Sequence, residues 1–117
     1  MKIQKLILSK YRRFALSEIP YICIDFSTPM QLLLGTNGSG KSSLLSELTP
    51  LPANPSDFDK GGYKELHIQF KGEDFILRSE ISRGAKHSFI RNGVELNPGG
   101  TALVQKDLVE RELGYTS

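Results

Sequence analysis

The sequence predicts an α/β fold, and three of its stretches indicate this class. Residues 30–45 contain an apolar run, a glycine-rich loop and a Leu-rich segment, in the order expected for strand, loop and helix. Residues 63–96 alternate apolar and polar side chains in short runs separated by turn residues, which is typical of antiparallel strands. Residues 101–114 repeat apolar side chains at helical spacing. The 117 residues suffice for one small domain with a modest core.

Composition and charge set further bounds. The net charge is +2 and the pI is near 8.7, which is too mild to indicate nucleic-acid binding by itself. The positive excess lies in residues 1–60, with seven Lys and Arg against five Asp and Glu, whereas residues 61–117 carry eight of each. No stretch has the apolar length of a signal peptide or a membrane span, so we expect a cytoplasmic protein without membrane association.

The first expected element is a strand over residues 2–9. Apolar residues stand at both odd and even positions of this stretch. Strict alternation would place Ile3 and Ile7 on one face of the strand and Leu6 and Leu8 on the other.

A second strand is expected over residues 19–26, where alternate side chains are apolar. The single cysteine, Cys23, lies between two isoleucines, and we expect it to be a buried strand residue rather than a nucleophile or ligand. One cysteine forms no disulfide within the chain, which fits a reducing compartment. A turn then leads into the apolar run Met30–Leu34. This stretch, alone or with one neighbour, is the part of the chain expected to form a parallel strand.

The glycine-rich loop fills every fixed position of the phosphate-binding pattern G-x-x-x-x-G-K-[ST], with Gly35, Gly40, Lys41 and Ser42. Glycines allow successive backbone N–H groups to curve around a phosphate, and the dipole of the following helix adds to the attraction. Lys41 would then reach the β- and γ-phosphates, and the hydroxyl of Ser42 would bind Mg²⁺. The residues predicted here to bind nucleotide are Gly35, Thr36, Asn37, Gly38, Ser39, Gly40, Lys41, Ser42 and Ser43.

After the loop, a helix is expected over residues 41–48. It ends before T-P-L-P-A-N-P, because three prolines within a few residues cannot continue a helix. Residues 49–62 are therefore expected to be a long loop, and loops of this length are often functional.

An antiparallel meander follows over residues 63–96. Leu66, Ile68 and Phe70 are expected on the core face of its first strand, with His67 at the surface. Further strands are expected through residues 75–81, 87–91 and 94–96, and the Asn92-Gly93 pair indicates a hairpin between the last two. His87 has no second histidine and no carboxylate at the spacing of a metal site. We therefore expect it to be either a structural residue or an exposed one, and both interpretations stay open.

A C-terminal helix is predicted between Thr101, a suitable N-cap, and Gly114, a suitable C-terminal residue. Val104 pairs with Leu108, and Val109 pairs with Leu113, at i,i+4 spacing. These pairs predict one broad apolar face that docks against the rest of the fold.

Hydrolysis of a nucleotide also needs an acidic residue after a buried strand, and none is found beyond Ser42. The stretch Leu96–Gly100 has a faint likeness to the L-S-G-G signature of ABC-type ATPases, but Pro98 replaces a signature residue. We interpret this stretch as a turn between hairpin and helix. The chain therefore looks like half of a nucleotide-binding head.

Four stretches together resemble one family. They are K-I-Q-K-L-I-L-S-K-Y-R-R-F, L-L-L-G-T-N-G-S-G-K-S-S-L-L, D-F-D-K-G-G-Y-K-E-L-H-I-Q-F and F-I-L-R-S-E-I-S-R-G. In this order they resemble the N-terminal lobe of SMC/SbcC-type ATPases, most of all the DNA double-strand-break repair branch with its phage recombination endonuclease subunits. The resemblance covers essentially residues 1–117.

The resemblance implies a P-loop NTPase fold of the ABC-ATPase head type, with residues 1–117 as a partial domain whose C-terminal lobe is absent. Arg12 would approach the nucleotide phosphates, with Arg13 in place of a small polar residue, and Asn37 would lie near the γ-phosphate. Residues 59–62 match weakly a loop near adenine and ribose, where Lys60 alone stands out. The implied cofactors are ATP and Mg²⁺.

The resemblance also implies partners. Two heads would form a homodimer around two ATP molecules, the missing C-terminal lobe would supply the signature and acidic motifs, and engagement of the heads would control access of DNA to an SbcD-type nuclease. The expected activity is that of an ATPase in the full assembly, with this chain alone inactive.

Two other functions stay open. One is an ABC transporter nucleotide-binding subunit, although the residues upstream of the loop differ from the usual transporter pattern. The other is a DNA-binding module with a vestigial nucleotide site, for which the sequence offers several basic residues without showing that they share a face. These residues are Arg12, Arg13, Lys60, Lys64, Arg83, Lys86 and Arg91.

Overall fold

The computed structural model describes residues 1–12, 21–26 and 47–115. The phosphate-binding motif of residues 35–42 lies outside the described residues, as do Arg13, the expected parallel strand Met30–Leu34 and all but the end of the expected helix 41–48. The predictions for these stretches therefore stay predictions.

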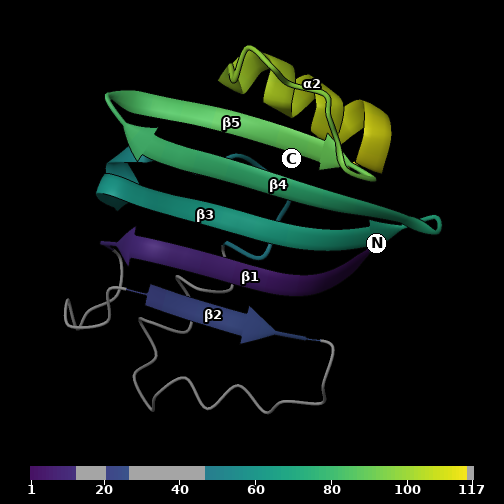
Figure 1. The fold of residues 1–117 in the computed structure, drawn as a ribbon, viewed down its shortest axis with the longest axis horizontal. Helices are drawn as coiled ribbons and strands as arrows, with labels where there is room; N and C mark the ends of the chain where they lie inside the picture. Colours follow the sequence, from purple (N-terminus) through teal and green to yellow (C-terminus); the bar gives the residue numbers. More distant parts are fainter. Residues whose placement is uncertain (13–20, 27–46, 116–117) are drawn as a thin grey trace.

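A six-stranded antiparallel sheet organises the described chain, in the order β2-β1-β3-β4-β5-β6 (Figure 1). The strands β3 to β6 are consecutive neighbours, which confirms the predicted meander. The strands are β1 Lys2–Tyr11, β2 Tyr21–Asp25, β3 Phe58–Phe70, β4 Glu73–Ser82, β5 Gly84–Arg91 and β6 Val94–Glu95.

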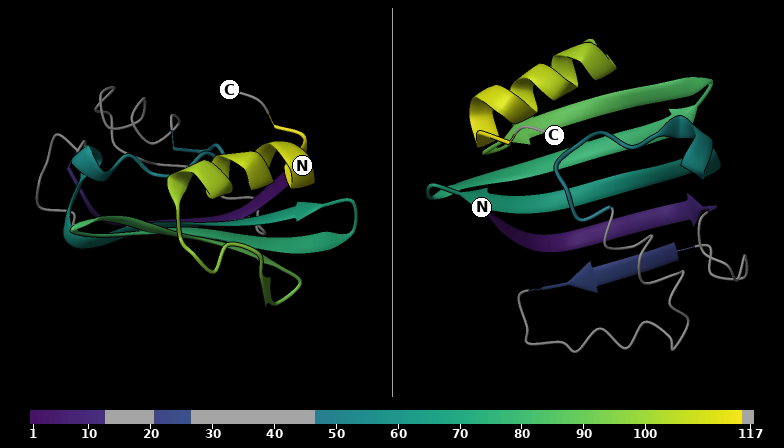
Figure 2. Two further views of the ribbon diagram at one scale, coloured as in Figure 1. Left: turned by 90° about the horizontal axis from the view of Figure 1, so that it is seen from above. Right: turned by 180° about the vertical axis from the view of Figure 1, so that it is seen from behind.

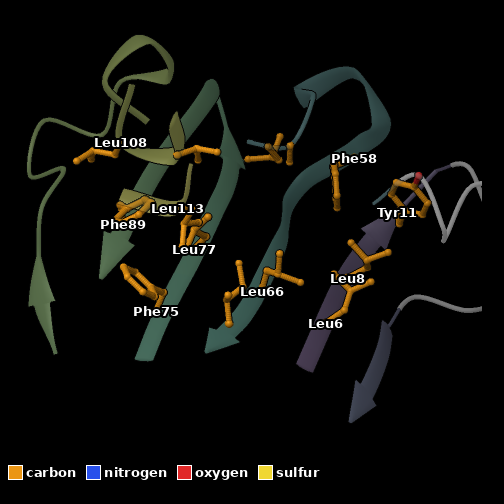
Figure 3. Packing of buried hydrophobic residues seen from close by; sticks show 14 of the residues in the cluster. Leu6, Leu8, Tyr11, Phe58, Leu66, Phe75, Leu77, Phe89, Leu108 and Leu113 are labelled. Atoms are coloured by element: carbon orange, nitrogen blue, oxygen red, sulfur yellow. The ribbon is translucent and has the colours of Figure 1, made fainter. Parts of the chain in front are cut away.

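One face of this sheet is covered by the helix α2 (Ala102–Leu113) and by the segment that carries the short 3₁₀ helix η1 (Pro55–Asp57), as both views in Figure 2 show. The core lies between them and the sheet (Figure 3). Its largest fully buried apolar side chains are Phe75, Phe89, Leu6, Leu8, Leu66, Ile68, Leu108 and Val109.

The helix α2 begins and ends as predicted. The hydroxyl of Thr101 accepts a hydrogen bond from the backbone N of Val104 at 3.3 Å, and Gly114 adopts the left-handed conformation with φ of 64°. The predicted apolar face is only partly right, because Val104 is 42% exposed. Gln105 is instead 1% exposed and lies against β5, where its Nε2 donates to the carbonyl oxygen of Ser88.

The predicted faces of β1 are wrong at its first residues. Ile3 pairs with Ile68, but Lys5 pairs with His67, so the register shifts by one residue at Gln4. Such a bulge moves Ile3 onto the same face as Leu6 and Leu8, and Ile3 packs against the core.

The prediction that Cys23 is buried is also wrong, since its side chain is exposed. Cys23 pairs with Ile7 on β1, whereas its neighbour Ile24 pairs with the buried Leu6 and is itself buried. Only one face of this sheet is covered by described residues, so the alternate side chains of β2 have different surroundings.

Three predictions about turns and loops can be compared with the structure, and two of them are confirmed. Asn92 and Gly93 both have positive φ, 48° and 83°, and form the predicted two-residue hairpin between β5 and β6. The loop predicted over residues 49–62 is shorter, because β3 already begins at Phe58 and pairs with Tyr11. Residues 96–100 form the turn predicted between hairpin and helix.

Candidate nucleotide site

Arg12 is the described member of the predicted nucleotide-binding set. It follows β1, and its backbone N donates to the carbonyl oxygen of Asp57 at 2.7 Å. Its side-chain Nε lies 2.6 Å from Oδ1 of Asp59, and the two side chains are 57% and 61% exposed. An ion pair this exposed is weak, so the guanidinium remains accessible to a stronger anion such as a phosphate.

The end of β1 lies beside the start of β3. Nζ of Lys10 donates to the carbonyl oxygen of Lys60 at 3.4 Å. A Cβ atom on Gly62 would lie 2.6 Å from the carbonyl oxygen of Ser9, so a side chain there would collide with β1. The structure thus brings together Lys10–Arg12 and Asp59–Gly62, two stretches on which the family resemblance rests.

A buried polar cluster lies next to Arg12 and consists of Tyr11, Glu47 and Lys64. Nζ of Lys64 lies 3.4 Å from Oε1 of Glu47, and the hydroxyl of Tyr11 donates to Oε2 of the same carboxylate at 3.1 Å. Lys64 also donates to the carbonyl oxygens of Thr49 at 3.1 Å and Leu51 at 3.2 Å. The three donors of its ammonium group therefore have three acceptors.

Burial lowers the pKa of Lys64 below its ordinary value, while the charge and hydrogen bond of Glu47 act in the opposite direction. Sequence reasoning treated Lys64 as a candidate phosphate contact, but the residue is only 4% exposed. Its position contained a signal for burial, since Lys64 precedes the core residues Leu66 and Ile68 at a spacing of two along β3.

The segment after Glu47 is attached to the sheet at a further point. The backbone N of Ala53 donates to Oγ of Ser79 at 3.2 Å, and that hydroxyl lies 2.7 Å from Nδ1 of His87. His87 is 3% exposed, and burial lowers its pKa below the ordinary value. The structural interpretation of His87 is therefore confirmed and the exposed one is wrong.

Two of the basic residues that a DNA-binding module would need are not free to contact a phosphate. Lys64 is buried. Arg91 lies between Glu73 at 2.5 Å and Glu112 at 3.0 Å. Arg12 has only its exposed pair with Asp59, and Arg13 lies outside the described residues.

On the opposite face of the sheet, charged side chains of β3 and β4 pair with each other. Glu65 accepts from Arg78 at 2.7 Å and contacts the partly exposed His67 at 2.8 Å. Partial burial raises the pKa of Glu65, but the hydrogen bonds from His67 and Arg78 outweigh this and lower it overall. Arg78 also lies over the ring of Tyr63, 4.0 Å from its centre.

Within residues 1–12, 21–26 and 47–115, no helix has the length and apolar character needed to cross a membrane. No group of three or more His, Cys, Asp and Glu side chains there is arranged to hold a metal ion. The predicted Mg²⁺ ligand, Ser42, lies outside these ranges.

Comparison with curated proteins finds a similarity over part of the chain. A stretch of 70 residues is 37% identical to the DNA double-strand break repair Rad50 ATPase of Thermococcus kodakarensis. The match covers 57% of this chain and 7% of that protein, so the chain spans a small fraction of the length of its relative. No family model matches the chain. The similarity supports a relation to Rad50-like repair ATPases at a coarse level.

Proposed function

We propose that this chain is the ATP-binding N-terminal lobe of an SbcC-type DNA repair and recombination ATPase with the P-loop NTPase fold. The proposal rests on the complete phosphate-binding motif of residues 35–42 and on the similarity to a Rad50 ATPase. ATP with Mg²⁺ would bind at this motif, with Lys41 on the β- and γ-phosphates and Ser42 on the metal ion.

One structural observation supports the proposal most. Glu47 follows Ser42 by five residues in the chain, and its carboxylate accepts a hydrogen bond from Tyr11, the neighbour of Arg12. Five residues span at most about 18 Å even when fully extended. A chain distance of this size would allow the motif and Arg12 to share one phosphate site, and this supports the proposal.

Binding and chemistry are divided in this proposal. Residues of this chain bind the phosphates and orient Mg²⁺, while the acidic residue that polarises water comes from a C-terminal lobe. Two such heads would sandwich two ATP molecules and so regulate access of DNA to a nuclease partner. The burial of Lys64 and the pairing of Arg91 with two carboxylates give less support to a module that binds DNA without nucleotide.

Equilibrium binding of ATP to the 117-residue chain in the presence of Mg²⁺ tests the proposal. Lys41→Ala should weaken binding by about 10- to 100-fold, as expected for the loss of a charge-assisted phosphate contact. Arg12→Ala should weaken binding by about 3- to 10-fold. Lys86→Ala is the matched control, because Lys86 is an exposed basic residue on β5, and this variant should bind like the parent.

A phosphate-release assay tests the division between binding and chemistry. The chain alone should release essentially no phosphate from ATP. Turnover that Lys41→Ala abolishes would show that the chain carries its own hydrolytic residues and would overturn this part of the proposal. Equal ATP affinity in the parent chain and Lys41→Ala would overturn nucleotide binding at the motif.

A further inference from the structure

The cluster of Tyr11, Glu47 and Lys64 does more than fill space in the core. Lys64 extends from the central strand β3, while Glu47, Thr49 and Leu51 belong to the segment that follows the phosphate-binding motif. All three contacts of its ammonium group go to this one segment. The side chain of Lys64 therefore binds three alternate residues of that segment, Glu47, Thr49 and Leu51.

The chemistry of the contacts makes this attachment specific. The side chains of Lys64 and Glu47 are 5% and 11% exposed, so their charges interact with little screening by water. Loss of one partner leaves the other charge buried and unpaired, which costs far more than the loss of an exposed pair. The carbonyl oxygens of Thr49 and Leu51 can both accept from the ammonium group of Lys64 only when the backbone of residues 49–51 has the observed conformation. The cluster therefore favours that conformation.

Glu47 also connects the segment to the neighbourhood of Arg12. Its second oxygen accepts from Tyr11, whose ring packs on Phe58 with the ring centres 5.1 Å apart. The cluster thus connects the chain after the motif to the end of β1 and the start of β3, where Arg12 and Asp59 lie.

We propose that Lys64 is a positioning residue for nucleotide binding, because through Glu47, Thr49 and Leu51 it holds the chain that follows the phosphate-binding motif on the sheet beside Arg12. This inference rests on the proposed nucleotide site. Lys64 itself makes no contact with the nucleotide in this arrangement, and its burial also removes it from the residues available to DNA phosphates.

The first test needs no nucleotide. Amide hydrogen exchange at Ala53, whose N–H is bonded to Ser79, reports attachment of the segment to the sheet. Lys64→Met should speed exchange at Ala53 by at least about 10-fold relative to amides of β4. Asn97→Ala is the matched control, because it also removes a buried polar side chain, in the turn before α2, and it should leave the ratio unchanged. An unchanged ratio in Lys64→Met would overturn the inference.

The second test measures the consequence for ATP with Mg²⁺, under conditions where circular dichroism shows each variant folded. Lys64→Met should lose about 10-fold in ATP affinity, and the control Asn97→Ala should stay within about twofold of the parent. Equal losses in both variants would mean a general stability effect and would overturn the inference.

Glu47→Gln extends the test to a milder change, since glutamine retains an acceptor for Tyr11 but removes the charge. It should show a smaller acceleration at Ala53 and a smaller loss of ATP affinity than Lys64→Met, and no effect on either would overturn the role of the ion pair. Failure of the parent chain to bind ATP would instead refute the proposed function, while the exchange experiment still decides the attachment.

Discussion

Oγ of Ser79 lies 2.7 Å from Nδ1 of His87, and the two residues are cross-strand partners on β4 and β5. Ser79 accepts from the backbone N–H of Ala53, and its hydroxyl proton can be donated to the nitrogen of a neutral imidazole. A neutral ring agrees with the pKa of His87, which burial lowers. The contact joins two strands and the covering segment.

The free energy of unfolding should therefore decrease as the pH falls below 6.5, the ordinary pKa of histidine. A lowered pKa in the folded state means that the unfolded chain takes up the proton first, so acid favours unfolding. The slope is limited to about 1.4 kcal/mol per pH unit for one proton. Urea denaturation at several pH values measures it. His87→Gln should flatten this part of the profile, and equal profiles for the parent and His87→Gln would contradict the assignment.

The buried amides of Asn97 and Gln105 are expected to stabilise the docking of α2. Nδ2 of Asn97 donates to Oε1 of Gln105 at 2.9 Å, and Gln105 in turn donates to β5. Gln105→Ala removes both of these buried hydrogen bonds and should lower the free energy of unfolding by about 2 kcal/mol. Val104→Ala, one residue earlier and exposed, should change it by less than about 0.5 kcal/mol. Similar values for both in urea denaturation would contradict the network.

Gly62 and Gly99 provide a matched pair for the contact between β1 and β3. A Cβ on Gly62 meets the backbone oxygen of Ser9 at 2.6 Å, whereas a Cβ on Gly99 has no atom within 4 Å. Gly62→Ala should destabilise the fold by about 1 to 3 kcal/mol through displacement of the backbone. Gly99→Ala should be close to neutral. Thermal unfolding of the two variants compares them, and a neutral Gly62→Ala would show that the strands separate easily at this point.

Cys23 should react with a thiol reagent in the native protein, because its side chain is exposed. It is the only cysteine of the chain, so the colour released by Ellman's reagent reports this site alone. The reaction should go to completion without denaturant, at a rate within about tenfold of that in urea. Protection until the protein unfolds would mean that other parts of the chain cover this face of β2.

The sequence predicted correctly those elements that depend on interactions between residues close together in the chain. The alternation along residues 63–71, the hairpin at Asn92-Gly93, and the helix limits at Thr101 and Gly114 each depend on residues a few positions apart. The same holds for the order of the meander, because consecutive antiparallel strands with short turns must be neighbours.

The candidate site was predictable in part. The phosphate-binding motif and Arg12 follow from the sequence and the family resemblance, and the motif itself stays a prediction. The pairing of Arg12 with Asp59 joins residues 47 positions apart, and no periodicity in the sequence contains it. Lys64 was misjudged because a lysine is normally exposed, and only its partners Glu47, Thr49 and Leu51 make its burial favourable.

The sequence by itself thus determined the meander, the hairpin turn at Asn92-Gly93 and the limits of the C-terminal helix, and it shows which motif is available for phosphate. The tertiary structure decided which side of each element is covered, and with it the exposure of Cys23, the burial of Lys64 and Gln105, and the bulge that turns Ile3 inward. The physical reason is that backbone conformation responds to neighbours along the chain. Burial and charge pairing respond to whatever segment comes to lie on top, and that segment is distant in sequence.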